Sequence, residues 1–289
     1  MSLISKPVKQ AGKAVLAEAK HNATSPLVQW LERFGFLIRG LIYIVIGLLA
    51  LQLAVGAGGA TTSPTSAIAL LGRQPFGKLF LAVIAVGLAG YALWGFVRAI
   101  LDPLGRGTDA KGLMDRAGFI FSGISYAVLL IPTVQALMNK PGGSSQGSSA
   151  GVPATLMAGP WGKWLVIAFG LFWIAAGFGQ LAAAYTAHFM RDLNKNTMST
   201  EEVKTAIWLG KIGYTARGIV FALIGLITLQ TVFTAGAKKV PGFDAALATL
   251  AHAPYGGVLL GAVAIGLTLF GIYSALCAKW IHIGARRPA

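Results

Sequence analysis

Long apolar stretches alternate with short polar segments along the whole chain. Each apolar stretch is close to the roughly 20 residues that a helix needs to cross the hydrocarbon core of a bilayer. Within hydrocarbon, a spanning segment of this length satisfies its backbone polar groups only as a helix. The pattern therefore predicts six transmembrane helices, at residues 34–56, 77–99, 117–138, 162–185, 213–234 and 256–278.

A basic leader precedes the first apolar stretch and has a helical period of its own. From Ser5 to Ala23, the lysines fall on one helical face, and alanine and valine fall on another. Such a helix lies in the membrane interface, and with so small an apolar face it binds weakly unless anionic lipid is present. We expect residues 1–32 to form a cytoplasmic, basic, amphipathic segment with an interfacial helix.

The apolar stretches repeat as pairs. Three odd-numbered stretches align without gaps, as RFGFLIRGLIYIVIG from Arg33, RAGFIFSGISYAVLL from Arg116 and KIGYTARGIVFALIG from Lys211. Each even-numbered stretch follows a proline, an aromatic residue and a glycine, at Pro75, Pro160 and Pro254. Self-similarity at a fixed period indicates a tandem repeat. Because each copy holds two spans, all copies enter the membrane with the same polarity.

The predicted fold is thus an all-α integral membrane protein, with six transmembrane helices arranged as three tandem parallel two-helix hairpin repeats. The predicted segments are an N-terminal segment (1–32), repeat 1 (33–103), repeat 2 (104–190), a cytoplasmic linker (191–210), repeat 3 (211–283) and a tail (284–289). Of the 24 lysines and arginines, 18 lie at the termini and between hairpins, and 6 lie in the loops within hairpins. The positive-inside rule then places both termini in the cytoplasm.

Composition supports a membrane protein and argues against several other classes. Charged residues make up 11% of the chain, against about 25% in an ordinary soluble domain. The net charge of +15 comes from basic residues at the edges of the apolar stretches, so we expect no nucleic-acid partner. Cys277 is the single cysteine, which excludes an intrachain disulfide and a C-x-x-C site. We expect no metal and no cofactor.

The repeated helix motif, G-[FY] followed by [RS]-G and [YF], with P-[FWY]-G-[KG] before the second helix, resembles the bacterial membrane family catalogued as domain of unknown function 1206. The resemblance extends from about Arg33 to about Ile283, and the chain departs from the motif at Ser122 and Gly257. It implies a six-span protein of the prokaryotic cytoplasmic (inner) membrane. It brings no catalytic residues with it.

Three glutamines share one repeat position near the outer end of the odd-numbered helices: Gln52, Gln135 and Gln230. An unpaired amide in hydrocarbon costs several kcal/mol, so each side chain is expected to face protein or water. One interpretation is interhelical hydrogen bonding, with about 0.6 kcal/mol from each glutamine. The other is a shared polar cluster on a pseudo-threefold axis.

Two arginines, Arg39 and Arg217, lie about a turn and a half inside their predicted spans. A long cationic side chain at that depth can extend to the interface and anchor the topology. Alternatively, the two arginines contact lipid phosphate or an anionic ligand. Both interpretations are carried forward.

Glycines recur at the same repeat positions and predict close helix packing, because a helix without side chains at those points lets its neighbour approach. The six that align are Gly35, Gly40, Gly118, Gly123, Gly213 and Gly218. A seam inside the bundle and a seam for another membrane subunit have the same sequence pattern. The sequence leaves both open.

The four histidines are scattered and form no spaced metal pair, and no acidic residue falls in the middle of a predicted span. We therefore expect a non-enzymatic scaffold or accessory subunit, whose partners are membrane lipid and other membrane protein subunits. The alternative is a small pore or facilitator for a neutral solute or lipid, with the glutamines lining its path. An enzyme acting on lipid has the least support.

Overall fold

The computed structural model describes residues 26–61, 63–103, 105–138, 161–233 and 242–281. Within them, six helices are long and apolar enough to cross a membrane, as predicted. They are α2 (Pro26–Ala54), α4 (Gly77–Leu101), α5 (Ala110–Leu137), α7 (Gly162–Thr186), α8 (Thr200–Phe233) and α10 (Gly256–Trp280). The expected interfacial helix at Ser5 to Ala23 and the tail lie outside the described residues.

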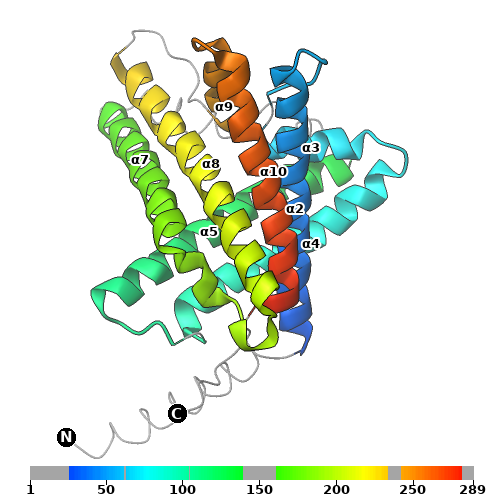
Figure 1. Ribbon diagram of the computed structural model, residues 1–289, viewed down its shortest axis with the longest axis vertical. Coiled ribbons are helices and arrows are strands. Elements are labelled where there is room, and N and C mark those ends of the chain that lie inside the picture. Colours follow the sequence, from blue (N-terminus) through cyan, green and yellow to red (C-terminus); the bar gives the residue numbers. More distant parts are fainter. Residues whose placement is uncertain (1–25, 62, 104, 139–160, 234–241, 282–289) are drawn as a thin grey trace, which may run out of the picture.

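The hairpins enter the bundle with one polarity. In Figure 1, α2 and α8 rise from the lower end of the bundle, whereas α7 and α10 return to it. The connections at residues 102–109 and 187–199 join successive hairpins at that lower end, which we call the linker end. Two short helices, α3 (Pro64–Gly72) and α9 (Phe243–His252), lie at the opposite end. Three tandem parallel hairpins are therefore confirmed.

The first helix of each hairpin (α2, α5 and α8) begins earlier than its apolar stretch does. Side chains cap two of these polar first turns. The Asp109 carboxylate accepts a hydrogen bond from the Gly112 amide at 3.2 Å. Ser199 and Glu202 form a reciprocal capping box before α8, with bonds of 2.8 and 3.2 Å. Capping therefore extends these helices beyond the hydrophobic pattern.

The polar loops within the first and third hairpins contain short helices that the sequence analysis did not predict. Ser63 caps α3 through the Ser66 amide, and Pro64 occupies the first helical position, where its missing N–H costs nothing. The proline–aromatic–glycine triplet then turns the chain into the next long helix. Phe76 and Tyr255 have positive φ values of 63° and 59°, and both are exposed. A Cβ on Gly77 would overlap the Gly72 carbonyl, so this turn needs glycine.

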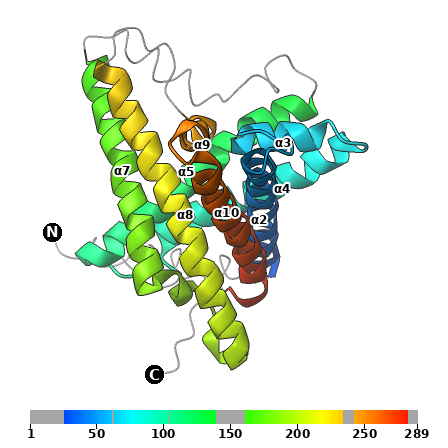
Figure 2. The ribbon, with the colours of Figure 1, turned by 45° about the horizontal axis from the view of Figure 1, so that its top comes forward.

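The tightest packing joins different repeats. Helix α10 of the third repeat packs on α2 of the first, α4 of the first packs on α5 of the second, and α7 of the second packs on α8 of the third. Within repeats, α2 packs on α4 and α8 on α10, whereas α5 and α7 contact each other little. Figures 1 and 2 show the α7–α8 and α10–α2 pairs side by side, with α4 and α5 crossing them obliquely. The repeats are therefore interlocked in a cycle.

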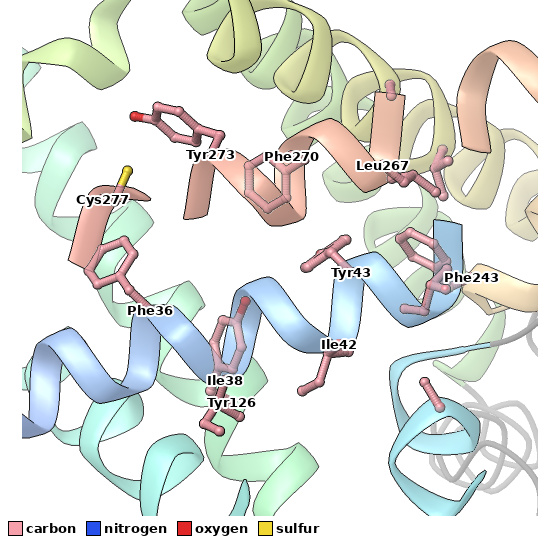
Figure 3. Packing of buried hydrophobic residues seen from close by; sticks show 14 of the residues in the cluster. Phe36, Ile38, Ile42, Tyr43, Tyr126, Phe243, Leu267, Phe270, Tyr273 and Cys277 are labelled. Atoms are coloured by element: carbon pink, nitrogen blue, oxygen red, sulfur yellow. The ribbon is translucent and has the colours of Figure 1, made fainter. Parts of the chain in front are cut away.

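Aromatic side chains fill the space between α2, α8 and α10. Phe270 is fully buried, and its ring contacts Tyr43 edge-on, with the centroids 4.9 Å apart. Figure 3 shows these rings facing each other across the α2–α10 seam, with Phe36 and Cys277 closer to the linker end. Edge-to-face contacts add a specific geometry to the packing of apolar surface. The middle of this helix trio is therefore a packed core.

An ion-pair network joins the two connections at the linker end. Arg106 binds Asp192 and lies 3.8 Å from Asp115. Asp115 also lies 3.4 Å from His188 and 3.8 Å from Arg191. Since Arg106 and Asp115 lie around the start of α5 and the other partners follow α7, the network ties together the two ends of the second hairpin. Partly buried pairs of this kind are screened by salt less than exposed ones.

Candidate functional site

Arg39 lies near the middle of α2 and is 6% exposed. Its Nε donates to the Ser274 hydroxyl at 2.7 Å, and a terminal nitrogen donates to the Tyr91 hydroxyl. Ser274 in turn donates to the Phe36 carbonyl at 2.9 Å. The guanidinium therefore links α2 to α4 and α10 inside the bundle. The expectation that this side chain extends to the interface was wrong, because neighbouring helices supply hydroxyl groups at the same depth.

Arg217 occupies the equivalent position on α8 and is half-buried. Its guanidinium carbon lies 4.4 Å from the centre of the Phe270 ring, and that of Arg39 lies 5.2 Å from the same centre. The Nε of Arg217 is buried without a hydrogen-bond partner. Aromatic faces attract cations, most strongly where water is excluded. Both cations are therefore stabilised by one shared ring.

No carboxylate lies within ion-pair distance of either guanidinium in the described part of the chain. Ionisable groups at membrane depth are costly, and they often mark functional sites. Among the described residues, aromatic rings and hydroxyl groups compensate the positive charge of the Arg39–Arg217 centre. Contact with lipid or an anion at these two arginines stays a prediction.

A second buried polar group was missed because α2 begins before its apolar stretch. Glu32 is fully buried, and Trp94 and Arg98 of α4 are 1% and 4% exposed. Both oxygens of Glu32, the Trp94 indole N–H and the Arg98 Nε have no hydrogen-bond partner. Native proteins usually satisfy such groups through ordered water. In the repeat alignment, Arg98 stands out because Ala183 and Cys277 occupy its equivalent positions.

The three glutamines lie in the last turn or so of their helices, at the end opposite the linkers. Gln52 and Gln230 are exposed and Gln135 is half-buried. At a helix end, an amide can reach the headgroup region, so its burial in hydrocarbon is no longer required. Convergence of Gln52, Gln135 and Gln230 on a shared site stays a prediction.

Three of the predicted packing glycines form equivalent seams between repeats. A Cβ on Gly40 would lie 2.7 Å from the Gly271 carbonyl oxygen, one on Gly218 3.0 Å from that of Gly177, and one on Gly123 3.1 Å from that of Ala92. Gly271, Gly177 and Ala92 occupy the same repeat position in the second helix of each hairpin, which is α10, α7 and α4 respectively. The same repeat residues therefore form all three seams, which is the close approach that small residues permit.

Of the other three predicted packing glycines, Gly35 and Gly213 face the second helix of their own repeat, whereas the prediction of packing inside the bundle was wrong for Gly118. A Cβ on Gly35 would lie 2.7 Å from the Tyr91 Cβ, and one on Gly213 would lie 2.7 Å from the Phe270 Cβ. Around Gly118, no atom lies within 4 Å of the Cβ position. The first and third hairpins are thus closed at this level. The second hairpin is open.

Helices α5 and α7 are also the least covered spans. In the most apolar 18-residue window of each helix, 22% of the residues of α5 and 17% of those of α7 are buried, against 44% to 56% in the other four. The two helices still touch through aromatic side chains, as between Phe121 and Phe172, whose ring centroids are 4.7 Å apart. We call the uncovered surface of α5 and α7 around Gly118 the open face.

The comparison with known proteins agrees with the repeat structure. The family described as Domain of Unknown Function (DUF1206) matches residues 34–102, 117–187 and 212–280. The chain belongs to this family. The three DUF1206 segments coincide with the three helical hairpins. Each segment runs from the first helix of a hairpin (α2, α5 or α8) to the end of the second (α4, α7 or α10).

A bacterial relative is similar to almost the full chain. Uncharacterized protein YxxB of Bacillus subtilis (strain 168) is 33% identical over 261 residues, which cover 90% of this chain and 94% of that protein. No solved structure matches the chain.

Proposed function

We propose that this protein is a non-enzymatic scaffold or accessory subunit, and that it binds another membrane protein through the open face. The observation that carries the proposal is the difference between Gly118 and its two repeat equivalents. Gly35 and Gly213 are each packed against a neighbouring helix. At Gly118 the missing side chain leaves the same notch in the helix surface, and no described atom lies within 4 Å of its Cβ position. A helix from a partner would occupy this notch as Tyr91 and Phe270 occupy the other two.

The physical chemistry of the bilayer favours this kind of contact. Lipid tails are as apolar as leucine, so helix association in a membrane depends on close packing and hydrogen bonds rather than on burial of apolar surface. A helix surface with a glycine notch therefore offers more to a partner helix than a surface of long side chains does. The exposed Phe172 of α7, whose ring contacts Phe121 about one turn from Gly118 on α5, extends the contact area.

The alternative of a pore for a neutral solute has less support. A polar path would need room between the helices, and the space between α2, α8 and α10 is filled by Phe270 and Tyr43. Gln52 and Gln230 are exposed at the helix ends. A robust solute flux in liposomes that is abolished by the triple leucine variant of the glutamines would nevertheless favour the pore.

Purification in mild detergent tests the scaffold directly. We expect the wild type to carry a stoichiometric membrane protein partner. Gly118→Trp should lose that partner without losing thermal stability, because the added ring projects from the open face. The matched control is Leu48→Trp, at an exposed position of α2, which should retain the partner. Recovery of the wild type with lipid alone would count against a scaffold.

We further propose that the linker end and both termini face the cytoplasm of a prokaryotic cell, with the chain in the inner membrane. The excess of lysine and arginine at the linker end supports this orientation. A cysteine at Ser145, introduced after Cys277→Ala, should react with an impermeant reagent in intact cells. Reaction only after lysis would reverse the orientation.

A further inference from the structure

A groove of about 340 Å³ runs between α8 and α10. Apart from one lysine and one threonine, its lining is aliphatic side chains and glycine. The lining residues that matter here are Lys211, Thr215, Ala216, Ile219, Ala262 and Gly266. The groove belongs to the third repeat, so it is separate from the open face formed by the two helices of the second.

Comparison of the repeats shows how the side chains at this position differ. In the first repeat, Ile38 of α2 fills the space above Gly87 of α4. In the second, the equivalent residues are Phe121 and Phe172, whose rings pack edge-on with their centroids 4.7 Å apart. In the third they are Ala216 and Gly266, the smallest pair of the three. A Cβ on Gly266 would lie 2.5 Å from the Ala216 Cβ, so the helices approach closely at this pair. With so little side chain on either helix, the pair forms the floor of a groove that lies along the surface of α8 and α10.

One end of the groove carries a positive charge. Lys211 is exposed, lies nearest the linker end of the lining, and takes part in no ion pair among the residues that the structure describes. Trp208, about one turn closer to the linker end, is 58% exposed. Exposed tryptophan is typical of the interface between membrane and water. The Lys211 ammonium can therefore reach the headgroup layer from the groove.

The other end of the groove points toward the middle of the bilayer. From Lys211 to Ile219 the axis of α8 advances by about 12 Å, at about 1.5 Å per residue. Half of the hydrocarbon core is about 15 Å thick. The groove thus has a cation at the interface and an apolar surface that reaches nearly as deep as one leaflet. A phospholipid with a negative headgroup is complementary to it, with the headgroup at the cation and an acyl chain along the apolar surface.

We propose that this groove is a binding site for one anionic phospholipid, with an acyl chain between α8 and α10 and the headgroup phosphate on Lys211. The chain lies along the groove over its floor of Ala216 and Gly266, and Lys211 selects the charge. Thr215 donates its hydroxyl to the Lys211 carbonyl at 2.8 Å, so its hydroxyl hydrogen is engaged within α8. The ammonium group is then the main ligand for phosphate.

Native mass spectrometry of the full chain from detergent containing phosphatidylglycerol or phosphatidylcholine tests the site. The wild type should retain one phosphatidylglycerol in preference to phosphatidylcholine. Lys211→Gln should weaken phosphatidylglycerol retention about fivefold, the factor expected from one lysine near a membrane surface, and should leave phosphatidylcholine unchanged. Lys204→Gln, in the same helix but ion-paired with Glu201, is the matched control and should behave as wild type.

Filling the groove tests the acyl chain. Ala216→Ile copies the residue that the first repeat has at this position, and Ala262→Leu fills the groove from its exposed rim. Both should lose retention of either lipid, and Ala262→Leu remains informative if the buried Ala216 site tolerates isoleucine poorly. Wild-type retention in Ala262→Leu, or equal behaviour of Lys211→Gln and Lys204→Gln, would overturn the proposal. Neither result bears on the partner at Gly118.

Discussion

At the scale of single residues, the three repeats use equivalent positions for different chemistry. Arg39, Ser122 and Arg217 align in the sequence, yet only Arg39 is enclosed by hydrogen-bond acceptors on two other helices. A buried cation is tolerated when its donors are satisfied and aromatic faces replace part of its hydration. Arg39 therefore acts as a cross-link among α2, α4 and α10 as well as a source of positive charge.

Arg39→Ala should lower the stability of the purified protein by about 2 to 3 kcal/mol, because it breaks two charge-assisted hydrogen bonds and leaves a cavity. Unfolding in mixed micelles, followed by circular dichroism, measures the loss. Arg33→Ala, at an exposed position of the same helix, should change stability by less than about 0.5 kcal/mol. Equal stability of the two variants would mean that the Arg39 guanidinium reaches water.

At the scale of helices, small residues decide which faces meet. At the Gly40, Gly123 and Gly218 seams, the first helix of each hairpin packs against the second helix of the preceding repeat. The pairs are α2 with α10, α5 with α4, and α8 with α7, so the third repeat takes the place before the first. The α4–α5 pair differs from the other two pairs further along α5, where Leu130 stands at the repeat position that Gly47 and Gly225 occupy in α2 and α8. A leucine there keeps the backbones apart, which agrees with the looser packing of α5.

Alanine substitutions at one repeat position should have opposite effects in different repeats. Gly35→Ala and Gly213→Ala place a methyl group 2.7 Å from a neighbouring Cβ, and overpacking of this kind costs roughly 1 to 3 kcal/mol. Gly118→Ala meets no described atom and should leave stability unchanged or raise it by up to about 1 kcal/mol, since alanine favours the helix.

The same thermal or denaturant unfolding of all three variants makes this comparison. A loss in Gly118→Ala as large as that in Gly35→Ala would show that the second hairpin is closed, and the open face would have to be abandoned.

At the scale of the whole molecule, the cyclic packing makes the repeats depend on one another. The strongest contact of the first repeat is with the third, through α2 and α10. The linker-end network adds a polar tie between the ends of the second hairpin. An isolated hairpin would leave its main seam exposed, so we expect the three repeats to fold as one unit.

A disulfide between α2 and α10 tests this arrangement. The Cβ position of Gly261 lies 3.6 Å from the Ala54 Cβ, within the range for a disulfide. In a Cys277→Ala background, Ala54→Cys with Gly261→Cys should cross-link on mild oxidation, so that fragments cut in the 187–199 connection stay joined. Ala54→Cys with Ile167→Cys, the equivalent position on α7, should not cross-link. The reverse result would rule out packing of the third repeat on the first.

The sequence by itself determined the number of spans, the starts of α4, α7 and α10, the three parallel hairpins and the packing glycines other than Gly118. These depend on hydrophobicity, capping and turn residues that act over a few positions along the chain. It did not predict the early starts of α5 and α8, because capped polar turns form helix without an apolar pattern. It also missed α3 and α9, whose 9 and 10 residues are too few for the hydrophobic period to identify a helix.

Only the tertiary structure decided which equivalent residues acquire neighbours. Gly35, Gly118 and Gly213 occupy the same repeat position, and so do Arg39 and Arg217, yet their surroundings differ because the side chains opposite them come from helices distant in the chain. The burial of Glu32 beside α4 and the groove at Ala216 have the same origin. A repeat fixes the local structure of each copy, whereas contacts between copies depend on residues such as Leu130 and Ala216 that break the repeat.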